Sequence, residues 1–278
     1  MRVTLFNLFF YAYTVYIAAK VALLAQFRDR HGLYPTLKAW GDTTVRALDV
    51  ILGAKVEVRG LENVPEFTPE RPVLLVSKHQ SELDVVMLAV LFPYTGAVAM
   101  KELENYPFFG TIMKKLEIVM VAIESGPQNR TEQTIEGAAA TFAQSRPMMI
   151  YPEGELMKLG AKERYRRGAA HIYTRLNPVT IPVVASLGVV WPRREWGKNP
   201  GTTGAIEFLE PMPEGLSFDA FQEEVEQRIE EGTMRLIREH APAAMLAEAE
   251  DRQARGVNNH NRIPKASREE PAEQSPAA

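Results

Sequence analysis

The chain has 278 residues, of which 46% are hydrophobic and 24% are charged, which is the composition of a folded protein rather than of a disordered one. It contains no cysteine, which excludes disulfides, cysteine nucleophiles and cysteine-bound zinc or iron–sulfur sites. Only five histidines are present, so we expect no metal site.

The net charge of −3 conceals a basic segment. Between Lys158 and Lys198, nine basic residues face two acidic ones, which gives +7 there and −10 for the rest of the chain. Such a segment indicates either an anionic partner or a solvated basic surface. It carries no nucleic-acid-binding motif and few interleaved aromatic residues, so we expect no nucleic-acid partner.

The N-terminus is the most apolar part of the chain. From Val3 to Phe27 the only charged residue is Lys20. As a helix this run would extend about 37 Å, which is enough to cross a bilayer. A secretory signal is the alternative, but the apolar run is long for one and no clear cleavage site follows. We expect a retained helix that spans the membrane or lies in its interface.

Helical and strand patterns alternate in the remainder of the chain. A second helix is predicted at Tyr34–Leu52, and an amphipathic helix at Phe218–Glu239. The strands predicted between them are Lys55–Arg59, Val73–Ser77, Gly96–Met100, Ile118–Ile123, Met148–Tyr151, Val179–Val184 and Ala205–Leu209. The helices predicted among those strands are Ser81–Leu91, Phe108–Leu116, Thr131–Gln144 and Gly168–Arg175. This alternation predicts an α/β fold, a sheet flanked by helices.

Three segments are expected along the chain. Residues 1–53 form a hydrophobic helical segment that anchors the protein to the membrane, and residues 54–250 form the α/β domain. Residues 251–278 are polar and aperiodic, which is typical of a disordered tail.

The first candidate site lies in a turn between a strand and a helix. Its sequence is Lys78-His79-Gln80-Ser81-Glu82-Leu83-Asp84. A carboxylate that accepts from one imidazole nitrogen raises the basicity of the other, so His79 and Asp84 suit a general base acting on a hydroxyl. The alternative is structural, because Ser81 followed three residues later by Asp84 is also a capping box.

The second candidate site follows the apolar strand that ends at Tyr151. Pro152 and Gly154 end that strand, which leaves Glu153 at its carboxyl end. Taken alone, this pattern is more often an ordinary turn than a site.

Four short motifs appear in a fixed order. They are His79-x4-Asp84, then Lys101-Glu102-Leu103 with Pro107-Phe108-Phe109-Gly110, then Tyr151-Pro152-Glu153-Gly154, then Ile181-Pro182-Val183. Their order and spacing over residues 55–215 resemble the glycerolipid acyltransferase family, which includes the 1-acylglycerol-3-phosphate acyltransferases with their HX4D motif. The resemblance implies a mixed αβ sheet domain preceded by a two-helix membrane-anchoring segment.

The resemblance also implies roles for individual residues. His79 would be the general base that deprotonates the acceptor hydroxyl, and Asp84 would orient it. Glu153 and Gly154 would belong to the acceptor side of the cleft, Pro182 would shape a strand end that lines it, and Lys101 would contact an anionic group. No cofactor is implied beyond the co-substrate, acyl-CoA or acyl-carrier protein.

The resemblance implies a membrane-associated acyltransferase. It would move a fatty acyl group to a lysolipid hydroxyl, foremost that of 1-acyl-sn-glycerol-3-phosphate, and so make phosphatidic acid for phospholipid synthesis. We expect it on membrane lipids at the cytoplasmic face of a bacterial inner membrane, as a monotopic or single-span protein.

The sequence departs from the family at two places that matter for the acceptor. Glu155 and Leu156 stand where the third motif usually has Thr-Arg, and Ala122-Ile123 stand where the second usually ends with a basic residue. The missing arginines ordinarily hold the acceptor phosphate. Glu155 would also repel a phosphate placed close by.

The departures leave several alternatives open. Other basic residues could replace the arginines, the candidates being Lys101, Lys158, Arg164, Arg166 and Arg167. Otherwise the acceptor is a different lysolipid, such as a lyso-ornithine lipid or a lysophospholipid. A non-catalytic lipid-binding homologue and a hydrolase of the same acyl substrates are the remaining alternatives.

Overall fold

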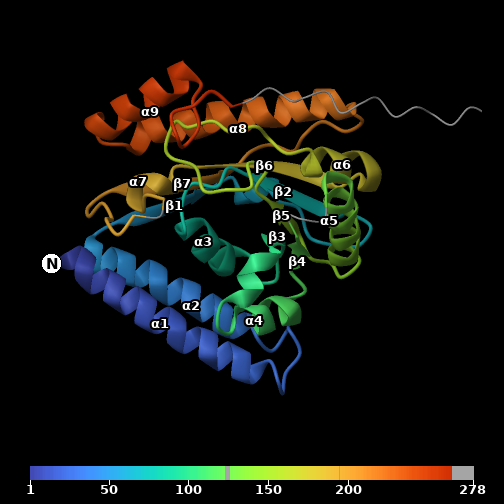
Figure 1. Ribbon diagram of the computed structural model, residues 1–278, viewed down its shortest axis with the longest axis horizontal. Helices are drawn as coiled ribbons and strands as arrows, with labels where there is room; N and C mark the ends of the chain where they lie inside the picture. Colours follow the sequence, from blue (N-terminus) through green and yellow to red (C-terminus); the bar gives the residue numbers. More distant parts are fainter. Residues whose placement is uncertain (123–125, 194, 265–278) are drawn as a thin grey trace, which may run out of the picture.

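The computed structural model describes residues 1–122, 126–193 and 195–264 (Figure 1). A seven-stranded sheet runs through the middle of these residues, in the order β1-β7-β6-β2-β5-β3-β4. The strands are β1 (Lys55–Arg59), β2 (Val73–Ser77), β3 (Gly96–Met100), β4 (Val119–Val121), β5 (Met148–Ile150), β6 (Val179–Ala185) and β7 (Thr203–Phe208).

The sheet is mixed, with one change of direction. β6, β2, β5, β3 and β4 are all parallel, whereas β7 is antiparallel to β6 and parallel to β1. In the register, Val76 of β2 lies beside Ile150 of β5 and Pro182 of β6. The carboxyl ends of β2 and β5 therefore meet at one edge, where ligands bind in open α/β sheets.

Helices cover both faces of the sheet, because every residue of β2 is buried and alternate residues point to opposite sides. Val73 and Leu75 pack in one core with α3 (Leu83–Leu91) and α7 (Leu187–Val190). Leu74 and Val76 pack in a second core, on the other side. That core includes side chains from α5 (Pro127–Phe142), α6 (Gly168–Leu176) and α8 (Phe218–His240).

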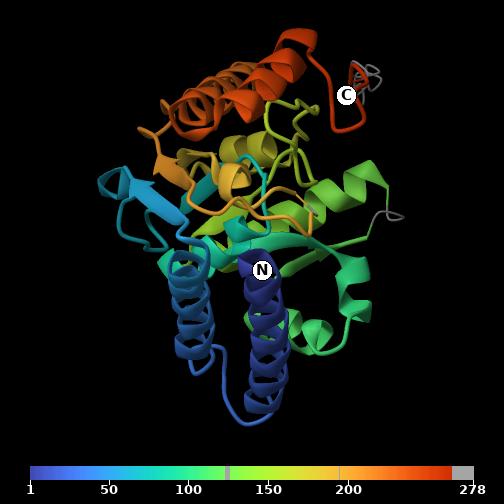
Figure 2. The same cartoon turned by 90° about the vertical axis from the view of Figure 1, so that its left-hand side faces the viewer.

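The two N-terminal helices form a hairpin against the α3 side of the sheet. α1 (Arg2–Leu24) and α2 (Tyr34–Ala47, continued by a π-helical turn at Leu48–Leu52) run side by side (Figure 2). A short helix, α4 (Phe109–Leu116), contacts α1. Trp40 of α2 donates from Nε1 to Thr14 Oγ1 of α1 at 3.0 Å, so the hairpin is joined by a polar contact as well as by packing.

One side of α1 is docked on the α/β domain. The rings of Phe6 and Phe10 meet the Trp191 ring edge-on, with centroids 5.5 and 4.8 Å away. Buried Asn7 donates from Nδ2 to the Trp196 carbonyl at 2.8 Å. These contacts fix α1 to the loop that follows α7, so α1 is part of the folded domain surface.

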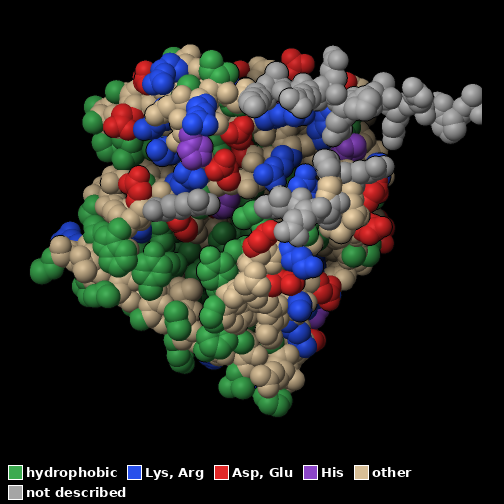
Figure 3. Space-filling model, viewed as in Figure 1, with side chains coloured by type: hydrophobic (Ala, Val, Ile, Leu, Met, Phe, Trp, Pro, Cys, Tyr) green, Lys and Arg blue, Asp and Glu red, His purple; other side chains and the backbone are tan. Residues whose placement is uncertain are grey.

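The opposite side of α1 is apolar and exposed. In Figure 3, hydrophobic side chains gather at the lower left, where α1 lies. The exposed large hydrophobic residues of α1 are Leu5, Leu8, Tyr11, Val15, Tyr16 and Leu23. Among the described helices, α1 alone is long and apolar enough to cross a membrane by length and composition.

Most predicted elements lie within a few residues of the observed ones. β4 is shorter than predicted, and the predicted last residue of that strand, Ile123, lies outside the described residues. α5 begins four residues earlier than predicted, at Pro127, a residue that favours the first turn of a helix. Three short elements were not predicted because each is too short to show a period: α7 and the 3₁₀ turns Leu61–Asn63 and Lys101–Asn105.

The prediction of a disordered tail from residue 251 is wrong for residues 251–264. A further helix, α9 (Ala243–Arg255), packs Ala249 into a small core with Leu159 and Ile237. Val257 and Asn259 are buried beyond its end. Polar composition misled the prediction, because these residues are held by hydrogen bonds to a loop distant in sequence. Residues 265–278 lie outside the described part of the chain.

The docking of α1 leads to a stability prediction. Phe6→Ala should lower the free energy of unfolding by about 3–5 kcal/mol, because it removes a fully buried ring from its contact with Trp191. Leu8→Ala, on the exposed side of the same helix, should change it by less than about 0.5 kcal/mol. Denaturant titration in detergent measures both. Equal effects of the two substitutions would contradict the docking.

Candidate active site

The turn between β2 and α3 brings His79 and Asp84 together. His79 Nδ1 lies 2.7 Å from Asp84 Oδ2, and the same oxygen accepts from the backbone N–H groups of Gln80 (2.8 Å) and Ser81 (3.0 Å). Because Oδ2 acts as an acceptor for all three, the proton of a neutral His79 ring belongs on Nδ1. Nε2 is then free to take a proton. The His79 side chain is 18% exposed, so a substrate can reach it.

Both interpretations of Asp84 hold in the structure. Asp84 accepts from the Ser81 N–H, which is one half of a capping box, whereas Ser81 Oγ accepts at 3.0 Å from the N–H of Leu83 and not from that of Asp84. One carboxylate therefore shapes the start of α3 and orients His79. The cap holds Asp84 in place, so the imidazole meets a preorganised acceptor.

The Tyr151 ring lies against the His79 ring. It directly follows β5, and its ring stacks on His79 with centroids 4.1 Å apart and planes inclined by 21°. Burial raises the pKa of Tyr151 well above 10, and the charge of Asp84 adds to the effect. The phenol therefore stays neutral. It fixes the plane of the imidazole, a role that the sequence motif did not reveal.

A buried ion-pair network lies behind the same turn. Lys78 Nζ is 2.9 Å from Glu153 Oε1 and 2.6 Å from Glu230 Oε1 of α8, and its side chain is 1% exposed. Tyr165 also donates to Glu230 Oε1, at 3.0 Å. The second carboxylate oxygen of Glu153 accepts from the His79 backbone N–H at 3.1 Å. The network thus joins the ends of β2 and β5 directly beneath the histidine.

Charge and burial oppose each other in this network. Burial acts to lower the pKa of Lys78, but the carboxylates of Glu153 and Glu230 outweigh it and the pKa is raised. Burial raises the pKa of Glu153 to about 7, against the attraction of Lys78. One lysine between two carboxylates leaves one negative charge in excess, so Glu153 takes up a proton more readily than an exposed glutamate does.

Two of the predicted acceptor-binding residues do not face the cleft. The Glu153 side chain is fully buried and its carboxylate is bound to Lys78 and to the backbone of His79, so it supports the catalytic turn instead. Pro182 is buried in the middle of β6 beside Val76, away from the strand end. The sequence placed Glu153 correctly after its strand but could not show which way its side chain points, and the expectation of Pro182 at a strand end is wrong.

The other two predicted acceptor-binding residues lie at the carboxyl edge of the sheet. Lys101 is exposed in the turn that follows β3. Gly154 has φ = +70°, and a Cβ there would lie 2.3 Å from Cζ of Arg166. Only glycine allows the guanidinium to lie this close to the backbone. Arg166 donates its backbone N–H to Pro152 O at 2.8 Å, which fixes it beside the end of β5.

The side chain of Arg166 is exposed. No carboxylate within the described parts of the chain forms an ion pair with its guanidinium. The residue therefore presents an uncompensated positive charge next to the motif that contains Gly154.

Much of the basic segment is neutralised locally. Arg193 Nη2 lies 3.1 Å from Glu155 Oε2, so Glu155 is turned toward a cation and does not present a free charge. Other ion pairs are Lys162 with Glu226 and Arg175 with Glu132. Buried Lys198 lies over the Trp191 ring at 4.5 Å. Arg194 lies outside the described residues.

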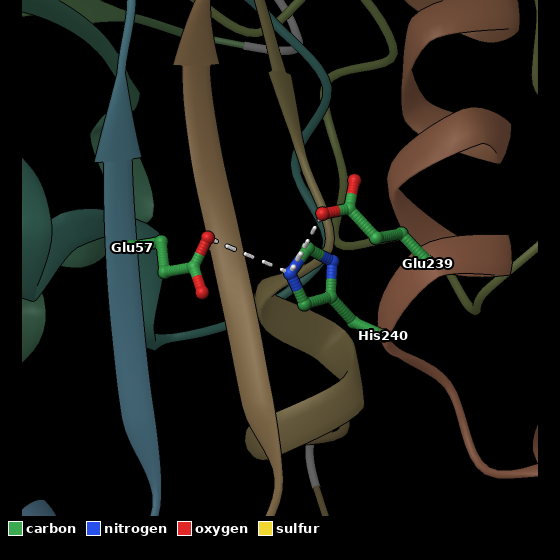
Figure 4. Close-up of side chains that lie close together, drawn as sticks. All are labelled: Glu57, Glu239 and His240. Atoms are coloured by element: carbon green, nitrogen blue, oxygen red, sulfur yellow. Dashed lines mark ion pairs between the residues drawn. The ribbon is translucent and has the colours of Figure 1, made fainter.

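A second cluster of ionisable groups, Glu57, Glu239 and His240, lies where β1 and α8 meet (Figure 4). His240 Nε2 is 3.9 Å from Glu57 and 3.8 Å from Glu239. Arg59 already forms ion pairs with both carboxylates, bidentate in the case of Glu239. The cluster is therefore satisfied as a contact between β1 and α8, and its donors do not fit a metal without displacing Arg59.

Comparison with known proteins agrees with the geometry. Residues 55–186 match the Acyltransferase family. The match covers just under half of the chain and identifies this part as an acyltransferase domain. The match supports an O-acyltransferase, and it begins at β1 and ends just after β6, so it contains both motif turns.

Relatives and a solved structure share the domain. A 1-acyl-sn-glycerol-3-phosphate acyltransferase of Pseudomonas aeruginosa is 27% identical over 186 residues, 67% of this chain and 70% of the relative. One of Saccharomyces cerevisiae is 30% identical over 146 residues, but the match spans only 45% of that protein. The crystal structure of the 1-acyl-sn-glycerophosphate acyltransferase PlsC from Thermotoga maritima superposes with a TM-score of 0.66 at 23% identity. That superposition covers 85% of this chain and 98% of PlsC, so the acyltransferase shares its fold.

The buried network leads to a second stability prediction. Lys78→Met should lower the free energy of unfolding by about 3–5 kcal/mol, because it leaves Glu153 and Glu230 without their cation. Lys162→Met is the matched control, since it breaks an ion pair with Glu226 in which Lys162 is 47% exposed, and should cost less than about 1 kcal/mol. Thermal and denaturant unfolding measure both. A Lys78 variant as stable as the control would show that the network adds nothing.

Proposed function

We propose that this acyltransferase moves a fatty acyl group from acyl-CoA or acyl-carrier protein to the free hydroxyl of 1-acyl-sn-glycerol-3-phosphate, making phosphatidic acid. The observation that carries the proposal is the His79–Asp84 pair, with Nδ1 held at 2.7 Å and Nε2 free. The names of the relatives support the acceptor, and the matched family supports the reaction class.

The pair accounts for each proton in the transfer. His79 Nε2 takes the proton of the acceptor hydroxyl as its oxygen attacks the thioester carbonyl. The charge of Asp84 stabilises the imidazolium that forms. When the tetrahedral intermediate collapses, the carbon–sulfur bond breaks, the new ester remains, and the imidazolium returns its proton to the thiolate. No acyl-enzyme is required.

Arg166 supports a phosphate-bearing acceptor. Glu155 and Leu156 occupy the places where related sequences have Thr-Arg, so the usual guanidinium is missing. The Arg166 side chain places a guanidinium over Gly154, which belongs to the same motif. Glu155 is neutralised by Arg193. Guanidinium groups bind phosphate through two parallel hydrogen bonds. We assign the phosphate to Arg166, with Lys101 as a second exposed cation at this edge.

A different lysolipid remains the second candidate acceptor. The observation that favours it is the absence of both motif arginines from the sequence. A lyso-ornithine lipid or a lysophospholipid lacks a terminal phosphomonoester and does not need them. The ordered His79–Asp84 geometry argues against a non-catalytic lipid-binding role.

We propose that α1 binds the membrane by lying in its interface. Phe6, Asn7 and Phe10 pack against the domain, and a spanning orientation would have to give up these contacts. The exposed apolar side of α1 would instead enter the boundary between headgroups and acyl chains. The protein would then be monotopic, on the cytoplasmic face of a bacterial inner membrane, where acyl thioesters are made.

We expect substitution of either member of the His79–Asp84 pair to reduce acyl transfer strongly. His79→Ala and Asp84→Asn should each lower kcat by about 10²–10⁴-fold, because one removes the base and the other removes the charge that stabilises its protonated form. His31→Ala, an exposed histidine in the loop between α1 and α2, is the matched control and should keep full activity. The assay follows thiol release and phosphatidic acid formation. Full activity of His79→Ala would refute the mechanism.

The phosphate assignment predicts a change in acceptor affinity. Arg166→Ala should raise KM for 1-acyl-sn-glycerol-3-phosphate roughly 10- to 100-fold with little change in kcat, because it removes a charged hydrogen-bond donor. Arg175→Ala, which breaks an exposed ion pair with Glu132, should leave KM unchanged. If KM is unchanged in both while a lyso-ornithine lipid is acylated faster, the second acceptor is correct.

A further inference from the structure

The C-terminal segment packs directly on the loop that carries the third motif. This loop, residues 155–163, follows Gly154, and the segment in contact with it comprises residues 252–262 after and at the end of α9 (Figure 1). The family match ends at Ser186, so the segment lies outside the part of the chain that defines the family. Several side-chain and backbone hydrogen bonds nonetheless join the loop to the segment.

Asn259 is the centre of this contact. It is 4% exposed, and its amide is fully used. Oδ1 accepts from the Lys158 backbone N–H at 2.8 Å, while Nδ2 donates to Leu156 O at 2.8 Å and to Glu155 Oε2 at 3.1 Å. One side chain therefore satisfies backbone groups on both sides of Met157. Buried backbone groups of this kind must find partners, and a loop without secondary structure has none of its own.

The residue between those two contacts touches the catalytic turn. The Met157 backbone N–H donates to the carbonyl of His79 at 2.5 Å, and the Met157 side chain is buried. The path from Asn259 to the histidine is thus two consecutive hydrogen-bonded steps. The side chain of Asn259 fixes Leu156 and Lys158, and the peptide of Met157 between them fixes the backbone of His79.

Three more contacts hold the segment against the loop. Lys162 N–H donates to Val257 O at 2.9 Å, and Arg252 Nη1 donates to Leu159 O at 3.1 Å. Gly160 has φ = +72°, and a Cβ there would lie 1.9 Å from the carbonyl oxygen of Ala249 in α9. The backbones of the loop and of α9 are therefore in direct contact, which leaves little freedom for the loop to move independently.

We propose that Asn259 is a positioning residue of the acyltransferase: it holds the loop 155–163 so that Met157 fixes the backbone of His79 and the unusual Glu155 is kept away from the acceptor. This inference rests on the proposed role of His79. It also gives a reason for the departure at Glu155, because a threonine there would lack the carboxylate that Asn259 and Arg193 share. Through Asn259 alone, the C-terminal segment would then act on the position of His79.

The first experiment separates positioning from general stability. In the full chain, Asn259→Ala should lower kcat about tenfold while KM for both substrates changes less than twofold, because a small displacement of the base affects proton transfer and not binding. The matched control is Arg255→Ala, which breaks an exposed pair with Asp251 on α9 and should keep kcat. Rates are normalised to folded protein by circular dichroism. An unchanged kcat for Asn259→Ala in folded protein would overturn the proposal.

The second experiment is a rescue by paired substitution. Asn259→Asp keeps the size of the side chain but places a carboxylate against that of Glu155, so kcat should fall. Adding Glu155→Gln supplies an amide donor in place of the second carboxylate and should restore part of the loss. If Asn259 only fills space, Asn259→Asp retains full kcat and the second substitution changes nothing.

The outcome for His79→Ala keeps the two proposals apart. Activity retained in His79→Ala would refute the proposed mechanism and this inference with it. An inactive His79→Ala beside a fully active Asn259→Ala would refute this inference alone.

Discussion

The buried ion pair between Lys78 and Glu153 is the interaction on which the site depends. It joins the ends of two neighbouring parallel strands, and its carboxylate also holds the backbone of His79. A charged pair without water is costly to form and more costly to break, so the two strand ends cannot separate without a large loss of stability. Glu230 of α8 brings a third element into the same network. The position of His79 is therefore set by the sheet and by a helix from the C-terminal part of the chain.

Single carboxylates in the site each serve two partners. Asp84 begins a helix and orients an imidazole with the same oxygen, and Glu155 shares its carboxylate between Arg193 and Asn259. Such shared acceptors couple local folding to the reaction. A carboxylate that must accept hydrogen bonds from the backbone cannot rotate away from the substrate. A preorganised arrangement of this kind costs no reorganisation during the reaction.

Local features of the site could be predicted from the sequence, whereas those that depend on distant residues could not. The strand Val73–Ser77 is fully buried and apolar up to Val76, so its extent follows from composition, and His79 and Asp84 lie within one turn. Glu153 was placed at the correct strand end but assigned to the cleft, because its partner Lys78 is 75 positions away and nothing in the spacing joins them. Asn259 lies in a polar stretch that has the composition of a tail, and only its contacts with Leu156 and Lys158 show that it is ordered.

The docking of α1 on Trp191 has a consequence for handling the protein. The contacts that hold α1 in place are between side chains of one chain, so they do not need lipid to form. In the proposed interfacial position, lipid would cover the opposite, apolar side of the helix. Without lipid or detergent, this apolar side would be exposed to water on an otherwise intact fold. Self-association through that surface would then precede any unfolding. If α1 lies in the interface as proposed, an amphiphile would keep the enzyme dispersed, while its own packing would maintain its shape.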